Sequence, residues 1–241
     1  MSEPILRVTD VSKTFGGLQA LDNVSFWVHP KEIVGLIGPN GAGKTTLFNV
    51  VSGYIRPTRG EVVYESSNVT GLPPYKLAAL GVGRTFQVVK PFSGLTVLEN
   101  VTIASLLRHP KRKNAERQAW HMLEFTGLAD RAHGQASGLT LAGRKRLEIA
   151  KALALEPNLL LLDEVVAGLN PTEADRTIEL ILKIRDEGMT ILIVEHIMRV
   201  IMNISDRIVV LNYGSKIAEG KPAEVAADPM VIEAYLGEAA A

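Results

Sequence analysis

The stretch from Gly38 to Thr45 constrains this chain more than any other part of it. Its residues read Gly-Pro-Asn-Gly-Ala-Gly-Lys-Thr, which fits the spacing G-x-x-x-x-G-K-[ST] of a phosphate-binding loop. The apolar run 33–37 precedes the loop, and the run 46–51 that follows it suits a helix. Strand, loop and helix therefore come in the required order, which favours a phosphate cradle over an ordinary glycine-rich turn.

Each residue type in this loop has a chemical purpose. Glycines permit dihedrals and close approaches that a β-carbon forbids, and the loop N–H groups join a helix N-terminus in facing anionic oxygens. Lys44 adds a mobile positive charge for the outer phosphates, and Thr45 offers a hydroxyl to Mg²⁺. The predicted nucleotide-binding residues are Gly38, Pro39, Asn40, Gly41, Ala42, Gly43, Lys44, Thr45 and Thr46.

The composition limits the classes of function. Of 241 residues, 46% are apolar, which suffices for one large domain or a domain with a subdomain. Lysine plus arginine equals aspartate plus glutamate at 26 each, so no basic field indicates a nucleic-acid partner. The absence of cysteine excludes disulfides and thiolate metal sites.

No stretch predicts export or a membrane span. The first residues, 1–4, lack the basic region and long apolar run of an export signal. The most apolar runs, 159–162 and 191–194, are far shorter than the roughly twenty residues that span a bilayer. A membrane role therefore requires a partner.

Strand patterns predict an α/β fold. Apolar and polar residues partly alternate over 5–15 and 24–28, as in half-buried antiparallel strands, and 61–65 looks like a third. The later runs 159–162, 191–194 and 207–211 are short, dense and aliphatic, as in parallel strands covered on both faces. Residues 212–215 predict a hairpin turn before 216–218. We expect a mostly parallel core sheet of the P-loop type with an N-terminal antiparallel β subdomain.

Helical spacing replaces this pattern between residues 95 and 156. The segments 115–126 and 141–155 carry apolar residues at helical intervals, which predicts an inserted α-helical subdomain. A further helix is expected from Pro171, with Asn170 as its cap, Glu173 reaching back to the cap and Gly188 ending it.

Two carboxylates, Asp163 and Glu164, follow the buried run 159–162. In a doubly wound sheet, ligands lie beyond the carboxyl ends of the strands, where the phosphate loop must also lie. We expect Asp163 to hold Mg²⁺ directly or through water, and Glu164 to orient and polarise the attacking water. The alternative is that both residues merely end a strand.

Two further polar residues are candidates by position. His196 follows the run 191–194, and its imidazole can contact the γ-phosphate, although a lone histidine there is usually structural. Gln87, in Arg-Thr-Phe-Gln, can contact Mg²⁺ or water through its amide oxygen. Neither residue carries much weight without the others.

Taken together, these motifs resemble the ATP-binding subunits of ABC transporters over nearly the whole chain. The resemblance makes 38–45 the Walker A loop, Gln87 the Q-loop, Leu162-Asp163-Glu164 the Walker B end, 167–170 the D-loop and His196 the H-loop. It assigns Phe15 to the aromatic position that stacks on adenine, with an ordinary strand aromatic as the alternative. It implies ATP and Mg²⁺ as ligands, with Thr45, Gln87 and Asp163 on the metal and Glu164, His196 and Gln87 in catalysis.

The signature region departs from the family pattern. Most members read Leu-Ser-Gly-Gly-Gln, whereas residues 139–143 read Leu-Thr-Leu-Ala-Gly. Thr140 keeps a hydroxyl that can cap the helix and reach phosphate, while Leu141 replaces a glycine and Gly143 partly compensates. The resemblance therefore implies nucleotide contacts by Thr140 and Gly143.

Three cations, Arg144, Lys145 and Arg146, lie near the N-terminus of this helix, where the helix dipole disfavours positive charge. A facing polyphosphate removes that conflict. For Lys145, an outward-pointing solubilising charge is an equal alternative.

A second departure from the family pattern is Val165-Val166 in place of the family's Pro-Thr or Pro-Ser, which leaves open the rigidity of the turn after Glu164.

The resemblance also implies partners. Two cassettes, identical or different, close head to tail over ATP, and a groove near Gln87 and 88–92 meets a cytoplasmic helix of a transmembrane permease. A periplasmic or extracellular solute-binding protein takes part indirectly. The chain is then a peripheral subunit on the cytoplasmic face of the membrane, with one domain over 1–241: a catalytic core of about 1–87 and 157–241, and a helical subdomain of about 88–156.

Within the family, 84–87, 95–101, 217–222 and 234–237 most resemble LivG-type subunits of branched-chain amino acid importers. Importers of urea or short amides use similar subunits, so the solute stays open at this point. Two other classes compete: a soluble ABC ATPase without transport, which usually has paired cassettes or long coiled coils, and a P-loop kinase, which needs an acceptor site and lid.

Overall fold

Two units make up the chain, one from residues 1–77 and 185–241 and the other from 78–184. The computed structural model describes residues 3–87 and 90–236. The predicted division into a catalytic core of about 1–87 and 157–241 and a helical subdomain of about 88–156 stays a prediction.

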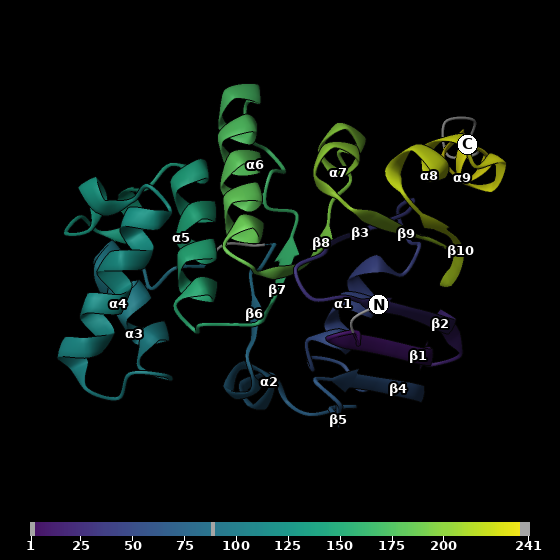
Figure 1. The fold of residues 1–241 in the computed structure, drawn as a ribbon, viewed down its shortest axis with the longest axis horizontal. Coiled ribbons are helices and arrows are strands. Elements are labelled where there is room, and N and C mark those ends of the chain that lie inside the picture. Colours follow the sequence, from purple (N-terminus) through teal and green to yellow (C-terminus); the bar gives the residue numbers. More distant parts are fainter. Residues whose placement is uncertain (1–2, 88–89, 237–241) are drawn as a thin grey trace. The chain divides into compact units, whose positions relative to one another are not determined.

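An antiparallel sheet opens the first unit. Its strands are β1 (Leu6–Phe15), β2 (Leu18–Val28), β4 (Arg59–Tyr64) and β5 (Ser67–Asn68), in the order β2-β1-β4-β5 (Figure 1). The predicted N-terminal antiparallel subdomain is confirmed. Strand β2 begins six residues before the predicted Val24, because Gly16 and Gly17, with φ of 48° and 96°, reverse the chain directly after Phe15 and pair it with Leu18.

Parallel strands form the core of this unit. Strand β3 (Ile33–Ile37) pairs in parallel with β8 (Thr190–Val194) and β9 (Arg207–Asn212), and β9 pairs antiparallel with β10 (Ser215–Gly220). Every residue of β3 and β8 is buried, as their dense aliphatic sequences predict. The predicted hairpin at 212–215 is confirmed. Helices of this unit are α1 (Lys44–Val51), α7 (Met198–Ile204), α8 (Pro222–Ala227) and α9 (Pro229–Leu236).

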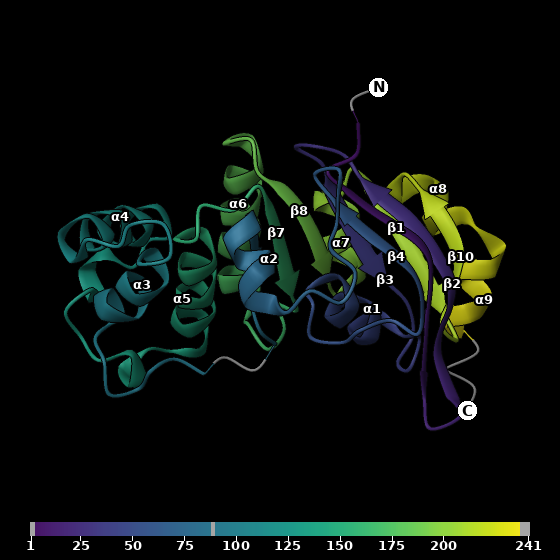
Figure 2. The same ribbon diagram turned by 90° about the horizontal axis from the view of Figure 1, so that it is seen from below.

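Helices dominate the second unit. Helices α3 (Val97–Ser105), α4 (Arg112–Phe125) and α5 (Leu141–Leu153) lie side by side (Figure 2). Their shared core includes Val97, Val101, Leu123 and Leu147, all fully buried. Two single-turn helices, Ala129–Arg131 and Ala136–Gly138, connect α4 to α5. The inserted helical block is therefore present as predicted.

One parallel strand pair belongs to the second unit. Strand β6 (Val82–Arg84) pairs with β7 (Leu159–Asp163), and every residue of β7 is buried. Helix α6 (Pro171–Asp186) begins with the predicted cap, because Asn170 Oδ1 accepts from the Glu173 N–H and Glu173 Oε2 accepts from the Asn170 N–H. Helix α2 (Pro74–Leu80) and α6 each run across a unit boundary.

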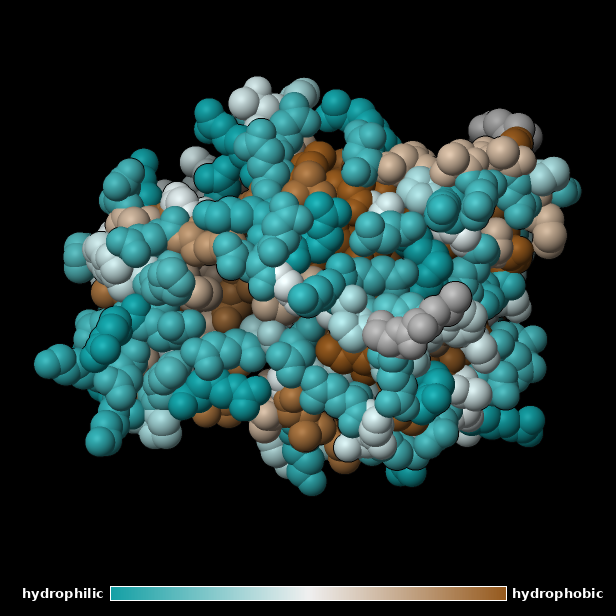
Figure 3. Space-filling view, in the orientation of Figure 1, coloured by the Kyte–Doolittle hydropathy of each residue, from teal (hydrophilic) through white to brown (hydrophobic). Residues whose placement is uncertain are grey.

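None of the helices over 3–87 and 90–236 is long and apolar enough to cross a membrane. Hydrophilic side chains cover most of the face drawn in Figure 3, interrupted by smaller hydrophobic areas.

Candidate nucleotide-binding and catalytic residues

The phosphate loop follows β3 and ends where α1 begins. At Gly38, with φ of 151°, a β-carbon would lie 2.1 Å from the Leu211 carbonyl oxygen, and at Gly43, with φ of 98°, it would lie 2.7 Å from that of Ala20. Both positions therefore exclude every residue but glycine. Gly41 has φ of 77°, and among the described residues nothing beyond its own chain neighbours lies within 4 Å of the point that a β-carbon would occupy there, so the middle of the loop is open.

Lys44 is the first residue of α1, and its ammonium curls back over the loop. Its Nζ donates to the carbonyls of Gly38 at 2.6 Å and Pro39 at 2.7 Å, and the residue is only 9% exposed. Gly43 caps α1 without a side-chain bond, and no acidic residue lies in the first turn. The N–H groups of this turn and the ammonium therefore form a site for an anion. Thr45 is exposed and Thr46 is half-buried.

Two other predicted residues belong to the same unit. Phe15 is 44% exposed at the end of β1, and Lys13 Nζ lies 4.9 Å from its ring centroid. An exposed aromatic ring at a strand end is available for stacking on a base. His196 is exposed after β8, and the preceding Glu195 is fully buried. The roles of Phe15 and His196 stay predictions.

Asp163 ends β7 in the second unit and is 6% exposed. Arg84 Nη2 lies 3.3 Å from its Oδ2, and the Asp163 N–H donates to Thr85 Oγ1 at 3.0 Å. Burial raises the pKa of the Asp163 carboxyl, and the positive charge of Arg84 opposes that rise. Asp163 is thus an inward-facing carboxylate with the positive charges of Arg84 and Lys145 nearby, rather than an exposed strand end.

Glu164, the next residue, has φ of 47°, a left-handed conformation that is uncommon for glutamate. Gln87 Nε2 donates to Glu164 Oε2 at 2.9 Å. The main-chain carbonyl oxygen of Glu164 accepts from Lys145 Nζ at 2.5 Å and from the Ala167 N–H at 3.3 Å. The structure therefore brings the predicted Gln87 and Glu164 together, while the predicted contact of Gln87 with a metal stays a prediction.

The signature region begins α5. Thr140 Oγ1 accepts from the Gly143 N–H at 3.2 Å, which confirms its predicted cap. Leu141 is 46% exposed, and its Cδ2 lies 3.2 Å from where a β-carbon at Gly168 would stand. The nucleotide contacts predicted for Thr140 and Gly143 stay predictions.

Two of the three cations of this region, Arg144 and Lys145, have acceptors within the unit. Arg144 donates to the carbonyls of Leu139 and Ser137, both at 3.0 Å. Lys145 is 6% exposed and reaches the Glu164 carbonyl. The interpretation of Lys145 as an outward solubilising charge is therefore wrong, and carbonyl dipoles offset the unfavourable placement of positive charge at a helix N-terminus.

Three residues beside the carboxylates were not predicted to lie there: Arg84, Thr85 and Lys145. Arg84 is the last residue of β6 and Thr85 follows it. Because Arg84 pairs with Leu161, both residues lie beside β7. Recognising residues 82–84 as a strand would have placed Arg84 and Thr85 next to Asp163. For Lys145, helical spacing would have helped, because Ala142, Lys145 and Ile149 all fall on the buried side of α5.

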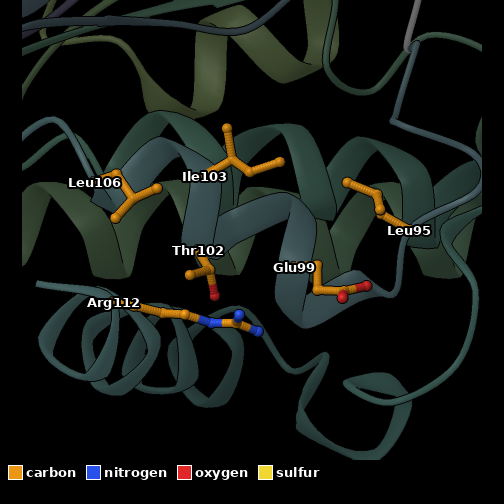
Figure 4. A pocket seen from close by; sticks show the side chains of 6 residues that line it. All are labelled: Leu95, Glu99, Thr102, Ile103, Leu106 and Arg112. Atoms are coloured by element: carbon orange, nitrogen blue, oxygen red, sulfur yellow. The ribbon is translucent and has the colours of Figure 1, made fainter. Parts of the chain in front are cut away.

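An apolar hollow of about 280 Å³ lies along α3 (Figure 4). Leu95, Ile103 and Leu106 supply its apolar surface. Glu99, Thr102 and Arg112 line it as well, and the Arg112 side chain extends along α3 from the start of α4. Ile103 and Leu106 are 43% and 39% exposed.

Phe92, which belongs to the groove predicted at 88–92, is held to the same helix. The buried Asn100 accepts from the Phe92 N–H at 2.9 Å and donates to its carbonyl at 3.1 Å. Val88 and Val89 of that groove, and Gly237 of the C-terminal resemblance, lie outside the described residues.

A model of the ABC transporter family matches residues 21–167, well over half of the chain. The chain belongs to this family. A second model, described as a branched-chain amino acid ATP-binding cassette transporter, matches the C-terminal residues 215–241 of the cassette. The cassette is accordingly an ATPase subunit that serves transport, and the predicted family and fold class are confirmed.

Curated relatives match the cassette along its whole length. The "High-affinity branched-chain amino acid transport ATP-binding protein LivG" of Escherichia coli (strain K12) is 44% identical, covering 99% of this chain and 100% of the relative. The corresponding protein BraF of Pseudomonas aeruginosa is 42% identical with the same coverage.

Solved structures match the fold. An ATP-binding cassette of an ABC transporter in its ADP conformation has a TM-score of 0.89 and 33% identity, covering 98% of this chain and 100% of that one. A dimeric cassette in a post-hydrolysis state with ADP and Pi has a TM-score of 0.81 and 26% identity, covering 90% of this chain and 98% of the other.

Proposed function

We propose that this cassette powers the uptake of branched-chain amino acids, as the ATP-hydrolysing subunit of an importer. The observation that carries the solute assignment is the match of residues 215–241 to the branched-chain amino acid cassette model, together with the full-length similarity to LivG. The C-terminal segment matters because the phosphate loop is common to all ATP-binding cassettes.

The phosphate loop binds the ATP phosphates. The charge of Lys44 and the N–H groups of the first turn of α1 meet the outer phosphates, and Phe15 stacks on adenine. Base stacking on an aromatic ring contributes about 1 to 3 kcal/mol where it has been measured by substitution. His196 contacts the γ-phosphate through its imidazole.

Mg²⁺ fits the donors that the cassette offers. Magnesium prefers hard oxygen ligands and keeps several waters, binding through one or two carboxylates plus substrate phosphates. Within the described part of the chain, no three His, Asp or Glu side chains gather into a metal site. We assign the metal to the ATP phosphates, the Thr45 hydroxyl, the Asp163 carboxylate and the Gln87 amide oxygen, because these are hard oxygen donors.

Glu164 acts as the general base. The Glu164 carboxylate accepts a hydrogen bond from Gln87, and this bond fixes the direction of the carboxylate. The carboxylate takes the proton of the attacking water. Thr140 and Gly143 at the start of α5 contact the nucleotide of a second cassette, which is identical or different. Support for such a pair comes from the dimeric cassette bound to ADP and Pi.

The permease docks on α3. A cytoplasmic helix of the membrane subunit suits the hollow lined by Leu95, Ile103 and Leu106, because an amphipathic helix packs its apolar face into such a groove. Glu99 and Arg112 at the hollow offer both signs of charge to the polar flanks of that helix. The cassette then lies on the cytoplasmic face of the membrane, and a solute-binding protein delivers the solute from the other side.

The test is transport by the reconstituted importer. The cassette, its permease and the solute-binding protein are placed in proteoliposomes with ATP, and uptake of labelled leucine is compared with uptake of labelled urea. We expect leucine uptake that depends on ATP, and permease-dependent stimulation of ATP hydrolysis. Uptake of urea but not leucine would assign another solute, and hydrolysis indifferent to the permease would favour a non-transport ATPase.

A further inference from the structure

Lys145 is a charged residue in a buried position. It is the fifth residue of α5 and is only 6% exposed, although lysine is almost never buried without a partner. Its ammonium donates to the main-chain carbonyl of Glu164 at 2.5 Å. A charge-assisted hydrogen bond of this kind is stronger than one between neutral groups.

The carbonyl that Lys145 holds belongs to a backbone in an uncommon conformation. Glu164 has φ of 47°, which non-glycine residues adopt only where the surroundings hold them. The turn that follows is closed by the Ala167 N–H on the same carbonyl, and Val165 and Val166 are buried at 3% and 0% exposure. Valine does not fix φ as proline does, so other contacts must hold this turn.

We propose that Lys145 is a positioning residue for Glu164. Its ammonium fixes the peptide plane after Glu164, while Gln87 fixes the carboxylate at the end of the same side chain. The inference deepens the proposed function, because it rests on the role of Glu164 as general base.

Geometry explains why the backbone contact matters. The chain is held on both sides of Glu164, by the Asp163 N–H on Thr85 Oγ1 and by the Ala167 N–H on the Glu164 carbonyl. A turn of the peptide plane after Glu164 must therefore be compensated by the dihedrals of Glu164 itself, which reorients its Cα–Cβ bond and moves the carboxylate. Displacing a catalytic group by about 1 Å can cost on the order of a hundredfold in rate. The contacts proposed between the cassette and its own ATP come from the phosphate loop, Phe15 and His196 and do not include Lys145, so the loss should fall on kcat.

The test compares three lysine substitutions in the full-length cassette with its permease. Lys145→Met removes the donor and keeps an apolar stem, Lys145→Arg keeps a cation, and Lys151→Met removes a lysine from the same helix. Lys151 is a matched control because its ammonium pairs with the buried Glu148 of its own helix at 2.7 Å. The measurements are kcat, KM for ATP, binding of ATP and the thermal unfolding midpoint.

We expect Lys145→Met to lower kcat about ten- to a hundredfold with KM changed less than about threefold. Lys145→Arg should recover most of kcat, and Lys151→Met should keep kcat near wild type whatever its unfolding midpoint. If Lys145→Met does not fold, Lys145→Gln, whose amide is too short to reach the carbonyl, replaces it with the same expected loss of kcat.

Three results would overturn the inference: a Lys145→Met enzyme with wild-type kcat, an arginine variant as slow as the methionine variant, or an equal loss in Lys151→Met. Glu164→Gln is measured in parallel. Wild-type turnover in Glu164→Gln removes the proposed role of Glu164 and this inference with it. An inactive Glu164→Gln beside an active Lys145→Met removes the inference alone.

Discussion

Gln87 Nε2 donates to Glu164 Oε2 at 2.9 Å, which joins the residue three places after β6 to the residue directly after β7. The two strands are parallel, with Arg84 opposite Leu161, so their carboxyl ends present both side chains at one edge. The glutamine thereby sets the direction of the carboxylate that is proposed as the general base.

Replacing Gln87 by alanine should lower kcat about tenfold, because the Glu164 carboxylate loses its orienting donor. Gln87→Glu should lower kcat further, since a second carboxylate at hydrogen-bond distance raises the free energy of the ionised base. Steady-state ATP hydrolysis measures both effects. Gln118→Ala on α4 is the matched control, and a loss of kcat in that variant as large as in Gln87→Ala would argue against the orienting role.

Glu164→Gln should keep ATP binding, abolish most turnover and trap a closed dimer. A positioned general base typically contributes about a hundred- to ten-thousandfold in rate, and glutamine has the shape of glutamate without its basicity. Turnover is followed by phosphate release and dimerisation by size-exclusion chromatography with ATP. Near-wild-type turnover in this variant would remove the assigned role of Glu164.

Lys44→Ala should act on binding rather than on the chemical step. The ammonium lies over the loop, 2.6 Å from the Gly38 carbonyl and 2.7 Å from that of Pro39, and alanine leaves the outer phosphates without that charge. Hydrogen bonds to charged groups are worth about 1.5 to 3 kcal/mol, so the Kd for ATP should rise about ten- to a hundredfold. Calorimetric titration measures the Kd. Lys76→Ala on α2, which lies outside the loop, should bind ATP normally.

Local motifs made much of this molecule predictable. The phosphate loop, the cap at Asn170, the hairpin at 212–215 and the Thr140 cap depend on residues within a few positions of one another, and each has the predicted form. Their geometry depends on backbone dihedrals and short-range hydrogen bonds, which are determined by the residue types at neighbouring positions.

Long-range contacts were the part that sequence could not supply. Lys145 reaches a carbonyl nineteen positions away, and Arg84 meets Asp163 across 79 positions. Their partners depend on how β6, β7 and α5 pack, because charge near a helix N-terminus by itself predicts exposure to solvent or to an anion.

Acid should weaken the start of α3 through Glu99. Its carboxylate accepts from the Thr96 N–H and hydroxyl in a capping box, and these hydrogen bonds lower the pKa of Glu99. A carboxyl whose pKa is lower in the folded state contributes stability above its unfolded pKa and loses it as pH falls through the folded value. The contribution should therefore disappear as pH falls below about 4.5, the ordinary value for this group.

Glu99→Gln tests this dependence, since glutamine does not ionise at that position. The thermal unfolding midpoint of the wild type should fall more steeply between about pH 5.5 and about pH 3 than that of the variant, because protonation is linked to folding. Glu116→Gln on α4 serves as the control for removing one carboxylate. Identical pH profiles for wild type and Glu99→Gln would contradict the expectation.

A charge placed in the apolar hollow of α3 should uncouple the cassette from its permease. Ile103 lines the hollow and is 43% exposed, so Ile103→Glu removes apolar surface without filling the helical core. Burying a carboxylate against the apolar face of a docked helix is strongly unfavourable. Stimulation of ATP hydrolysis by the permease should fall at least about tenfold, since even about two kcal/mol of lost affinity exceeds that factor. Basal hydrolysis by the isolated cassette should stay near wild type.

Leu107→Glu is the matched control for Ile103→Glu, because Leu107 is 46% exposed just after the same helix and is not among the residues that line the hollow. Equal loss in both variants would show that added charge, rather than this hollow, disrupts docking, and unchanged stimulation in Ile103→Glu would move the permease contact elsewhere on the cassette.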